Sequence, residues 1–206
     1  MTAGKFIALE GGEGVGKSTQ VKALAEALRQ RGIEVVITRE PGGSEGAERI
    51  RELLLSGSDD RWSPEAEALL FAAARADHVV KTIAPALEAG QWVLSDRFVD
   101  SSLAYQGGAA GLGIEAVRAI NAFGIRERFP DRTLVLTHPD GAERARARDA
   151  AGSDRIGGRP DDYHRRVEAG FRLIAAEEPE RVTLVDASGT PDQVTERLVA
   201  ALEDLL

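Results

Sequence analysis

Apolar residues follow two patterns along this chain. Short, continuous apolar runs are typical of strands buried on both faces of a parallel sheet, and they predict five strands, at residues 6–9, 33–38, 91–95, 132–137 and 181–185. Between these runs, apolar residues recur every three or four positions, which is the pattern of amphipathic helices. It predicts one helix after the first strand and others at about 44–56, 64–89, 99–106, 114–127, 140–148, 161–178 and 191–205.

Strands and helices alternate along the whole chain. This order predicts an α/β fold in three layers, α/β/α, with a five-stranded parallel sheet and right-handed crossovers. Ligands of such folds bind beyond the carboxyl ends of the strands. The length suits one domain spanning residues 1–206, with no repeat or long linker. Residues 149–160 lack hydrophobic periodicity and are rich in Gly, Asp and Arg, so we expect a flexible loop there, within a short lid at about 144–160.

Composition removes several classes of function. Because the chain has no Cys, it has no disulfides, Cys-ligated zinc, iron–sulfur cluster or thiol nucleophile, and a reduced, cytoplasmic location is expected. The longest apolar run, residues 68–74, is far shorter than the roughly 18 residues of a membrane-spanning helix, and no secretory signal is visible. A net charge of −8 disfavours nucleic acid as a partner. A small phosphorylated ligand remains compatible with all of these observations.

Residues 11–18, Gly-Gly-Glu-Gly-Val-Gly-Lys-Ser, match the pattern G-x-x-x-x-G-K-[ST] between a predicted strand and a predicted helix. Glycines let backbone N–H groups turn toward a polyphosphate at a helix N-terminus. Lys17 then reaches the β- and γ-phosphates, and Ser18 holds Mg²⁺. The motif predicts a P-loop NTPase fold that binds a nucleotide polyphosphate through Gly11, Gly12, Glu13, Gly14, Val15, Gly16, Lys17, Ser18 and Thr19.

The loop alone does not identify the reaction. Switch GTPases share it, and residues 186–189 offer their D-x-x-G sequence, but on the last predicted strand and without an N-K-x-D guanine motif anywhere in the chain. Partition-type ATPases carry a second Lys early in the loop, where this chain has Gly12. A switch or motor function is therefore disfavoured.

Two residue pairs are candidates for contacts to a second ligand. Asp96 and Arg97 directly follow a predicted strand, so they lie at the sheet edge of the loop and suit metal-bound phosphate, although a strand-end ion pair has the same spacing. Phe71 and Arg75 lie four residues apart in a predicted helix, where an aromatic plane and a forked donor can receive a planar base. For an isolated pair at this spacing, core packing with a surface salt bridge is the more common arrangement, so the spacing alone does not assign a binding role.

Several longer motifs resemble those of the thymidylate kinase family, most closely its bacterial form. Besides the loop, the resemblance is carried by FIALE at 6–10, TREPGG at 38–43, LFAAAR at 70–75, DRFVDSSLAYQG at 96–107 and VDASG at 185–189. It implies transfer of the γ-phosphoryl group of ATP to dTMP, giving dTDP and ADP, by an in-line step with Mg²⁺ in dTTP synthesis. It also implies a homodimer, with apolar helical surface at 64–89 or 114–123 as the contact.

The resemblance further assigns roles around dTMP and the metal. Phe71 is expected to stack on thymine and Arg75 to donate to its O4. Ser18 and Asp96 are the expected metal ligands. The remaining dTMP contacts that the resemblance implies are Ser102 at the base edge, Tyr105 beneath the sugar, Gln106 near the base, Arg97 on the acceptor phosphate with help from Arg39 and Arg51, and Glu13 near the sugar 3′-hydroxyl and the metal.

Arginines crowd into the predicted lid, at positions 144, 146, 148, 155 and 159. Glu13 stands where many members of the resembled family carry an arginine on the transferring phosphate, and in the bacterial subgroup the lid supplies that charge. The resemblance implies Arg148 or Arg155 as its source, Arg144 stacking on adenine, and a turn at 186–189, including Ala187, beside the adenine edge. Gly157 and Gly158 depart from the family pattern, in which an acidic residue follows Asp154-Arg155-Ile156. The expected catalytic residues are Glu13, Lys17, Arg97, Arg148 and Arg155.

This chemistry needs no general base, because a phosphate monoester with a second pKa of about 6 is already mostly anionic at neutral pH. The three histidines, His78, His138 and His164, lack ligand spacing and are interpreted as structural or surface residues. Two alternatives remain: a kinase of another acceptor, such as a deoxynucleoside or a different monophosphate, and a nucleotide-binding regulator without transfer activity. Tyr105 and the Phe71/Arg75 pair argue against the first, and the lid arginines with the acceptor motif argue against the second.

Overall fold

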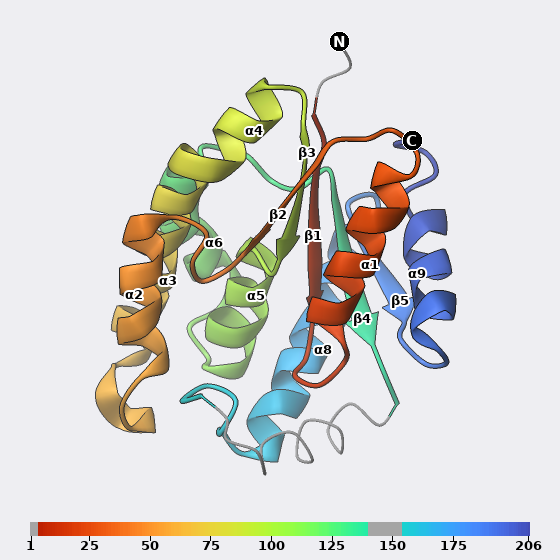
Figure 1. The fold of residues 1–206 in the computed structure, drawn as a ribbon. Helices are drawn as coiled ribbons and strands as arrows, with labels where there is room; N and C mark the ends of the chain where they lie inside the picture. The colour runs from red at the N-terminus through yellow and green to blue at the C-terminus, as the bar shows by residue number, and fades with distance from the viewer. Residues whose placement is uncertain (1–3, 140–153) are drawn as a thin grey trace.

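A five-stranded, all-parallel sheet forms the centre of the molecule. The computed structural model describes residues 4–139 and 154–206, and its strand order is β2-β3-β1-β4-β5. The predicted α/β fold with five parallel strands is confirmed (Figure 1). The strands are β1 (Phe6–Gly11), β2 (Val35–Arg39), β3 (Trp92–Asp96), β4 (Arg132–Thr137) and β5 (Val182–Asp186).

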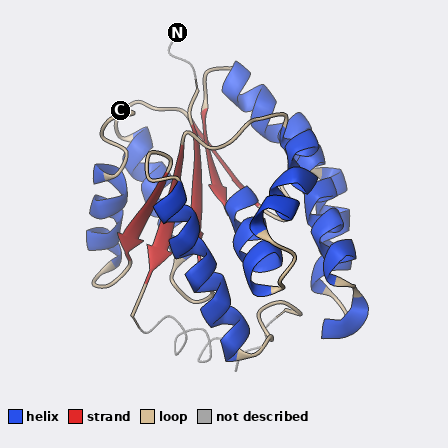
Figure 2. Cartoon of the chain, turned by 180° about the vertical axis from the view of Figure 1, so that it is seen from behind, coloured by secondary structure: helices blue, strands red, loops and turns tan. Residues whose placement is uncertain are grey.

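Helices cover both faces of this sheet, as Figure 2 shows from behind. One face carries α1 (Lys17–Arg29) and α9 (Pro191–Ala200). The other side carries α3 (Pro64–His78), α4 (Ala84–Glu88), α5 (Val99–Ser102), α6 (Ile114–Ile125) and α8 (Asp161–Glu177), with α2 (Glu45–Leu55) packed on α3. Within the described residues, no helix is both long and apolar enough to cross a bilayer.

The continuous apolar run in β1 follows from this three-layer packing. Successive side chains of a strand point to opposite faces. Ile7 and Leu9 pack in the cluster beneath α1 and α9, whereas Phe6 and Ala8 pack in the cluster on the opposite face. Because both faces are covered, a run without polar alternation is what the fold requires.

Two predicted helices contain widened, π-helical turns. The predicted helix 64–89 is α3 and α4 joined by η2 (Val79–Ile83), where the Ala84 N–H donates to the Val79 carbonyl, five residues back. Pro85 follows directly, and it lacks the N–H that a regular turn would use there. The predicted helix 99–106 is α5 followed by η3 (Leu103–Ala109). The predicted helix 140–148 lies outside the described residues.

The strand register brings the turns after β1 and β3 together. Leu9 pairs with Asp96, and Gly11 pairs with Leu136 of β4. The carboxyl ends of the three central strands therefore lie at one edge, at the lower end of the sheet in Figure 1. This is the edge at which α/β folds bind ligands.

Candidate active site

The glycine loop, residues 11–18, joins β1 to α1. Gly11, Gly14 and Gly16 have φ values of 133°, 73° and 91°, a region that L side chains rarely adopt. A Cβ on Gly11 would also lie 2.5 Å from the Leu136 carbonyl oxygen. The Thr19 N–H donates to the Gly16 carbonyl at 3.1 Å, but no side chain caps the first turn of α1, so the positive end of the helix can receive an anion.

Lys17 begins α1 and turns back onto the loop. Its Nζ donates to the carbonyl oxygens of Gly11, at 3.1 Å, and Gly12, at 2.5 Å. Burial, together with the nearby Arg97 guanidinium, lowers the pKa of Lys17 to about 8. A bound polyphosphate would replace the carbonyl contacts with charged oxygens and stabilise the ammonium form.

Ser18 and Asp96 meet at the edge of the loop. The Ser18 hydroxyl donates to the Asp96 carboxylate at 2.9 Å. Hydroxyl and carboxylate oxygens suit Mg²⁺, which typically takes one or two protein ligands and completes its shell with phosphate and water. The donor set therefore fits the metal that the sequence predicts.

A cavity of about 400 Å³ opens between the glycine loop, α3 and η3. Six loop and helix residues from the predicted nucleotide site line it, namely Glu13, Gly14, Gly16, Lys17, Ser18 and Thr19. All nine predicted dTMP contacts line the same cavity: Glu13, Arg39, Arg51, Phe71, Arg75, Arg97, Ser102, Tyr105 and Gln106. The fold thus brings the predicted nucleotide-polyphosphate site and the predicted dTMP site together around one cavity.

Arg97 lies where the two groups meet. It has a φ of 72°, an uncommon conformation for a residue with a side chain. Its guanidinium donates to the Gly11 carbonyl at 3.0 Å, to Glu13 at 2.5 Å and to the Tyr105 hydroxyl at 3.2 Å. These contacts hold a positive charge between the loop and η3.

Glu10 supports the turn that presents Arg97, and sequence reasoning missed it. This fully buried carboxylate accepts from the Phe98 N–H at 2.8 Å and from the Ser101 N–H and hydroxyl at 3.0 and 2.6 Å. Burial raises its pKa to about 7, although Arg97 acts in the opposite direction. The sequence carries one signal for this role, because Glu10 is a charged residue directly after the apolar run at 6–9.

Arg75 is fully buried at the far end of the cavity. Its Nε donates to Glu40 at 2.7 Å, and its Nη1 donates to Ser102 at 3.0 Å and to Asn121 at 2.5 Å. Nη2 donates to the Phe98 carbonyl at 3.1 Å. A guanidinium has five N–H bonds, so four are used by the described residues and one remains for a ligand.

Glu40 itself is held by a second buried side chain. His78 donates from Nδ1 to Glu40 at 3.0 Å, since a carboxylate only accepts, and its Nε2 lies 2.6 Å from the Thr38 hydroxyl. His78 therefore has the structural position that the sequence predicted. Phe71, in contrast, is only partly buried on the cavity wall, so the pair at 71 and 75 is not simple core packing.

Four of the predicted ATP contacts among the described residues do not line the cavity. Ala187 follows β5, is buried, and donates its N–H to the Thr137 carbonyl at 2.8 Å; it does not line the cavity, nor do Gly11, Gly12 and Val15. Arg144, Arg146 and Arg148 lie outside the described residues.

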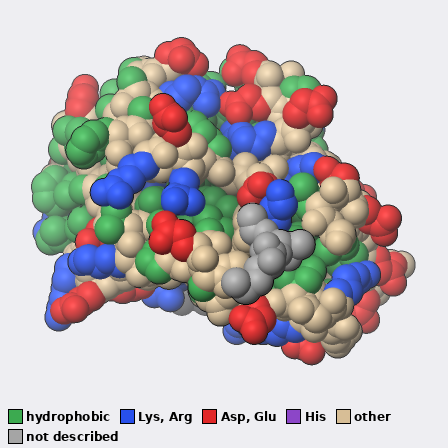
Figure 3. All heavy atoms as spheres, turned by 90° about the horizontal axis from the view of Figure 1, so that it is seen from above, with side chains coloured by type: hydrophobic (Ala, Val, Ile, Leu, Met, Phe, Trp, Pro, Cys, Tyr) green, Lys and Arg blue, Asp and Glu red, His purple; other side chains and the backbone are tan. Residues whose placement is uncertain are grey.

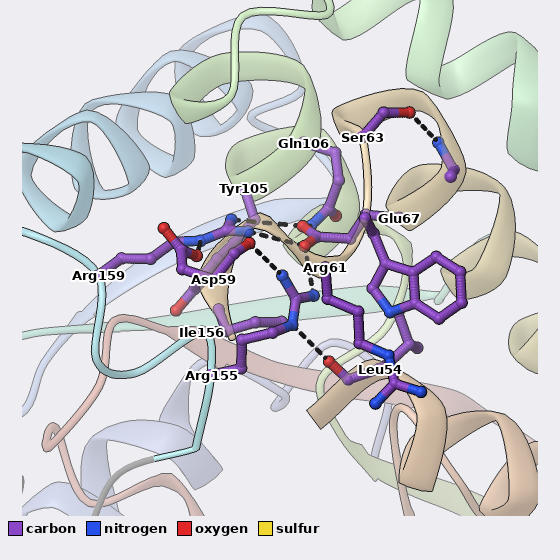
Figure 4. A network of polar contacts seen from close by, with 12 residues as sticks. Leu54, Asp59, Arg61, Ser63, Glu67, Tyr105, Gln106, Arg155, Ile156 and Arg159 are labelled. Carbon is purple, nitrogen blue, oxygen red and sulfur yellow. Dashed lines mark hydrogen bonds and ion pairs between the residues drawn. The ribbon is translucent and has the colours of Figure 1, made fainter. Parts of the chain in front are cut away.

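Arg155 occupies a buried ion cluster rather than the cavity wall (Figure 4). Its guanidinium donates to the carbonyls of Leu54 and Asp59, at 2.9 and 3.1 Å, and to Glu67 at 2.5 Å. Arg159 joins the same carboxylate at 2.7 Å. These arginines anchor the turn at 154–160 to α2 and α3, an arrangement that the crowding of arginines in the sequence did not suggest.

Comparison with known proteins extends over nearly the whole chain. A family model described as thymidylate kinase matches residues 9–198. The chain is 62% identical to a thymidylate kinase of Rhizorhabdus wittichii, covering 98% of this chain and 99% of that protein, and 46% identical to one of Halalkalibacterium halodurans, covering 100% and 99%. A crystal structure of thymidylate kinase from Ehrlichia chaffeensis superposes with a TM-score of 0.81 at 31% identity, covering 98% of this chain and 100% of that one.

Proposed function

This chain belongs to the thymidylate kinase family, and from that premise we propose that it transfers the γ-phosphoryl group of ATP to dTMP in dTTP synthesis, with Mg²⁺, giving dTDP and ADP. The observation that carries this proposal is the shared cavity. Predicted donor residues such as Lys17 and predicted acceptor residues such as Arg75 line one space, so two nucleotides can meet there with their phosphates facing each other.

The acceptor nucleotide is proposed to lie along the cavity from Arg75 to Arg97. Thymine stacks on Phe71, and its O4 accepts the remaining N–H of Arg75. The sugar lies over Tyr105, and the phosphate reaches Arg97. Further contacts are proposed for Ser102 and Gln106 at the base, Arg39 and Arg51 near the phosphate, and Glu13 near the 3′-hydroxyl and the metal.

Transfer requires alignment and charge neutralisation rather than proton abstraction. The dTMP phosphate has a second pKa of about 6, so its attacking oxygen is anionic at neutral pH. Lys17 and Arg97 flank the space where the phosphates would meet and offset the charge of the in-line transition state. Ser18 and Asp96 would hold Mg²⁺, which would offset the negative charge of the phosphates when it is bound.

The lid is proposed to complete the donor side. Of the two candidates for the arginine on the transferring phosphate, Arg155 has its guanidinium bound by Glu67 and two carbonyls. We therefore favour Arg148 for that role. Arg144 is proposed to stack on adenine, and the backbone at Ala187 to lie beside the adenine edge.

Phosphoryl transfer to a panel of acceptors tests the proposal. We expect dTMP to have the highest kcat/KM, with dUMP lower by about tenfold because it lacks one methyl group. The nucleotide dCMP should be rejected more strongly, because its 4-amino group donates and would face Arg75, which also only donates. A preference for thymidine over dTMP would overturn the assignment.

A homodimer is proposed through the face formed by α3, η2 and α6. Three large apolar side chains are exposed there, Leu69, Val80 and Phe123, and Phe123 is 94% exposed. Figure 3 shows apolar side chains gathered at its left edge, the side on which α3 lies in Figure 1. Burial of such a patch favours association. Light scattering of Phe123→Asp should report a monomer, whereas an unchanged dimer would place the interface elsewhere.

A further inference from the structure

Glu67 of α3 is a buried carboxylate that no step of the proposed reaction uses. It is 1% exposed and does not line the cavity. Figure 4 shows it at the centre of a polar network. Its Oε1 accepts from Gln106 at 2.9 Å and from Arg159 at 3.3 Å, and its Oε2 accepts from Arg155 at 2.5 Å and from Arg159 at 2.7 Å. All of its partners come from elements distant in sequence.

The contact to Gln106 fixes one wall of the cavity. Gln106 lines the cavity, is 1% exposed, and donates from Nε2 to Glu67. Because a carboxylate only accepts, it determines which end of the Gln106 amide is turned toward α3. The amide oxygen and the amide nitrogen therefore cannot exchange places without loss of this hydrogen bond.

The contacts to the two arginines fix a second wall. Arg155 and Arg159 flank Ile156, which lines the cavity and is 7% exposed. Arg159 also donates to the Asp59 side chain at 2.9 Å. The turn that carries Ile156 is thus held against α3 from both of its ends through one carboxylate.

A third path leads toward the phosphate end of the cavity. Arg159 donates to the Tyr163 hydroxyl at 2.6 Å, and this hydroxyl donates to the Tyr105 carbonyl at 3.1 Å. The Tyr105 hydroxyl in turn accepts from Arg97 at 3.2 Å. The network around Glu67 therefore reaches residues proposed to contact the base, the sugar and the phosphate.

Stability is a weak reason for such a cluster, because burial of ion pairs costs desolvation and an apolar cluster is often as stable. We propose that Glu67 is a positioning residue: it holds Gln106 and Ile156 in register across the acceptor cavity, so that dTMP affinity depends on a group that does not touch dTMP. This inference rests on the proposed acceptor site. Removing the Glu67 charge should loosen the two walls together.

The test compares Glu67→Gln with Glu65→Gln, an exposed carboxylate two residues earlier in α3. Steady-state kinetics should give a KM for dTMP raised by about tenfold in Glu67→Gln, since a small misplacement of a binding wall has effects of that order. The KM for ATP should change by less than about twofold, and Glu65→Gln should match the unmodified enzyme. A lower Tm with an unchanged KM for dTMP would reduce Glu67 to a purely structural role and overturn the inference.

A double-mutant cycle covers the case in which Glu67→Gln does not fold. Gln106 and Arg159 both donate to Oε1 of Glu67, so Gln106→Ala and Arg159→Ala should be coupled. The change in the dTMP dissociation constant of the double variant should differ from the product of the single changes by at least about threefold. If the change in the double variant equals the product of the two single changes within experimental error, the inference is overturned. Failure of the proposed function would look different: the unmodified enzyme itself would not phosphorylate dTMP.

Discussion

The glycine loop and the Arg75 end of the cavity differ in what pairs with their positive charges. Within the described part of the chain, Lys17 donates to carbonyl oxygens of its own loop, and its pKa is lowered. Arg75 is paired with the buried Glu40 and uses four of its five N–H bonds within the protein. Among residues 4–139 and 154–206, Lys17 therefore has no ion-pair partner within hydrogen-bond distance and a polyphosphate would supply one, whereas the cation at the Arg75 end is already paired. Donor binding should change the loop, and acceptor binding should use what is already in place.

Lys17→Ala is the largest test of this difference. We expect kcat to fall by at least about 10³-fold, the order of effect of removing a cation from a phosphoryl-transfer site. Binding of dTMP, measured by calorimetry, should stay within about threefold, because the base end does not depend on the loop. Lys22→Ala, an exposed lysine of the same helix, is the matched control. Equal loss of turnover and dTMP binding would mean that the two ends are not separable.

Arg75→Ala tests the opposite end. It leaves the Glu40 carboxylate buried with His78 but without its cation, so the free energy of unfolding should fall by about 3–5 kcal/mol. Binding of dTMP should be lost, while an ATP analogue still binds to the folded fraction. Denaturant titration measures the first effect, and Arg49→Ala, an exposed arginine of α2, is the control. A loss of less than about 1 kcal/mol would show that the pair behaves like a surface ion pair.

The same contrast explains what the sequence could predict. The glycine loop is built from consecutive backbone groups, so a local motif identifies it, and the five strands follow from apolar runs that two covered faces require. The acceptor end is built from side chains of α3, η3 and the turn after β3. Phe71, Arg75, Ser102, Tyr105 and Gln106, which line this end of the cavity, were predicted to bind dTMP through the resemblance to thymidylate kinases, and the family match confirms that resemblance.

Three buried carboxylates were missed for a physical reason. Glu10, Glu40 and Glu67 act through partners that are distant in the sequence, so no local spacing reveals them. Each has only an indirect signal. Glu67, for example, precedes Phe71 by one helical turn, which places a charge on the buried face of α3. The anchoring role of Arg155 was not predicted for the same reason, because its partner Glu67 is distant in the sequence.

Glu10→Gln tests the buried carboxylate that holds the turn of Arg97, through the pH dependence of the free energy of unfolding. The pKa of Glu10 in the folded protein, about 7, lies above its ordinary value of 4.5, so the folded state binds this proton more tightly. The stabilisation is fully present below pH 4.5 and is lost as the pH rises through 7. The free energy of unfolding, relative to Glu10→Gln, should therefore fall by on the order of 3 kcal/mol over this range. If the free energy of unfolding of the two proteins changes with pH in parallel, the pKa of Glu10 is not raised in the folded state.

Proton uptake on nucleotide binding is the smallest effect and separates the two ends most directly. With a pKa of about 8, Lys17 is about half neutral at pH 8, and a polyphosphate requires its ammonium form, so ATP binding should take up about half a proton. The acceptor end should take up almost none, because a guanidinium is not deprotonated in proteins and the dTMP phosphate is already a dianion at pH 8. Calorimetry in two buffers of different ionisation enthalpy measures both values. Equal uptake for ATP and dTMP would mean that the charge of Lys17 responds to either nucleotide, and the division between an incomplete donor end and a finished acceptor end would be wrong.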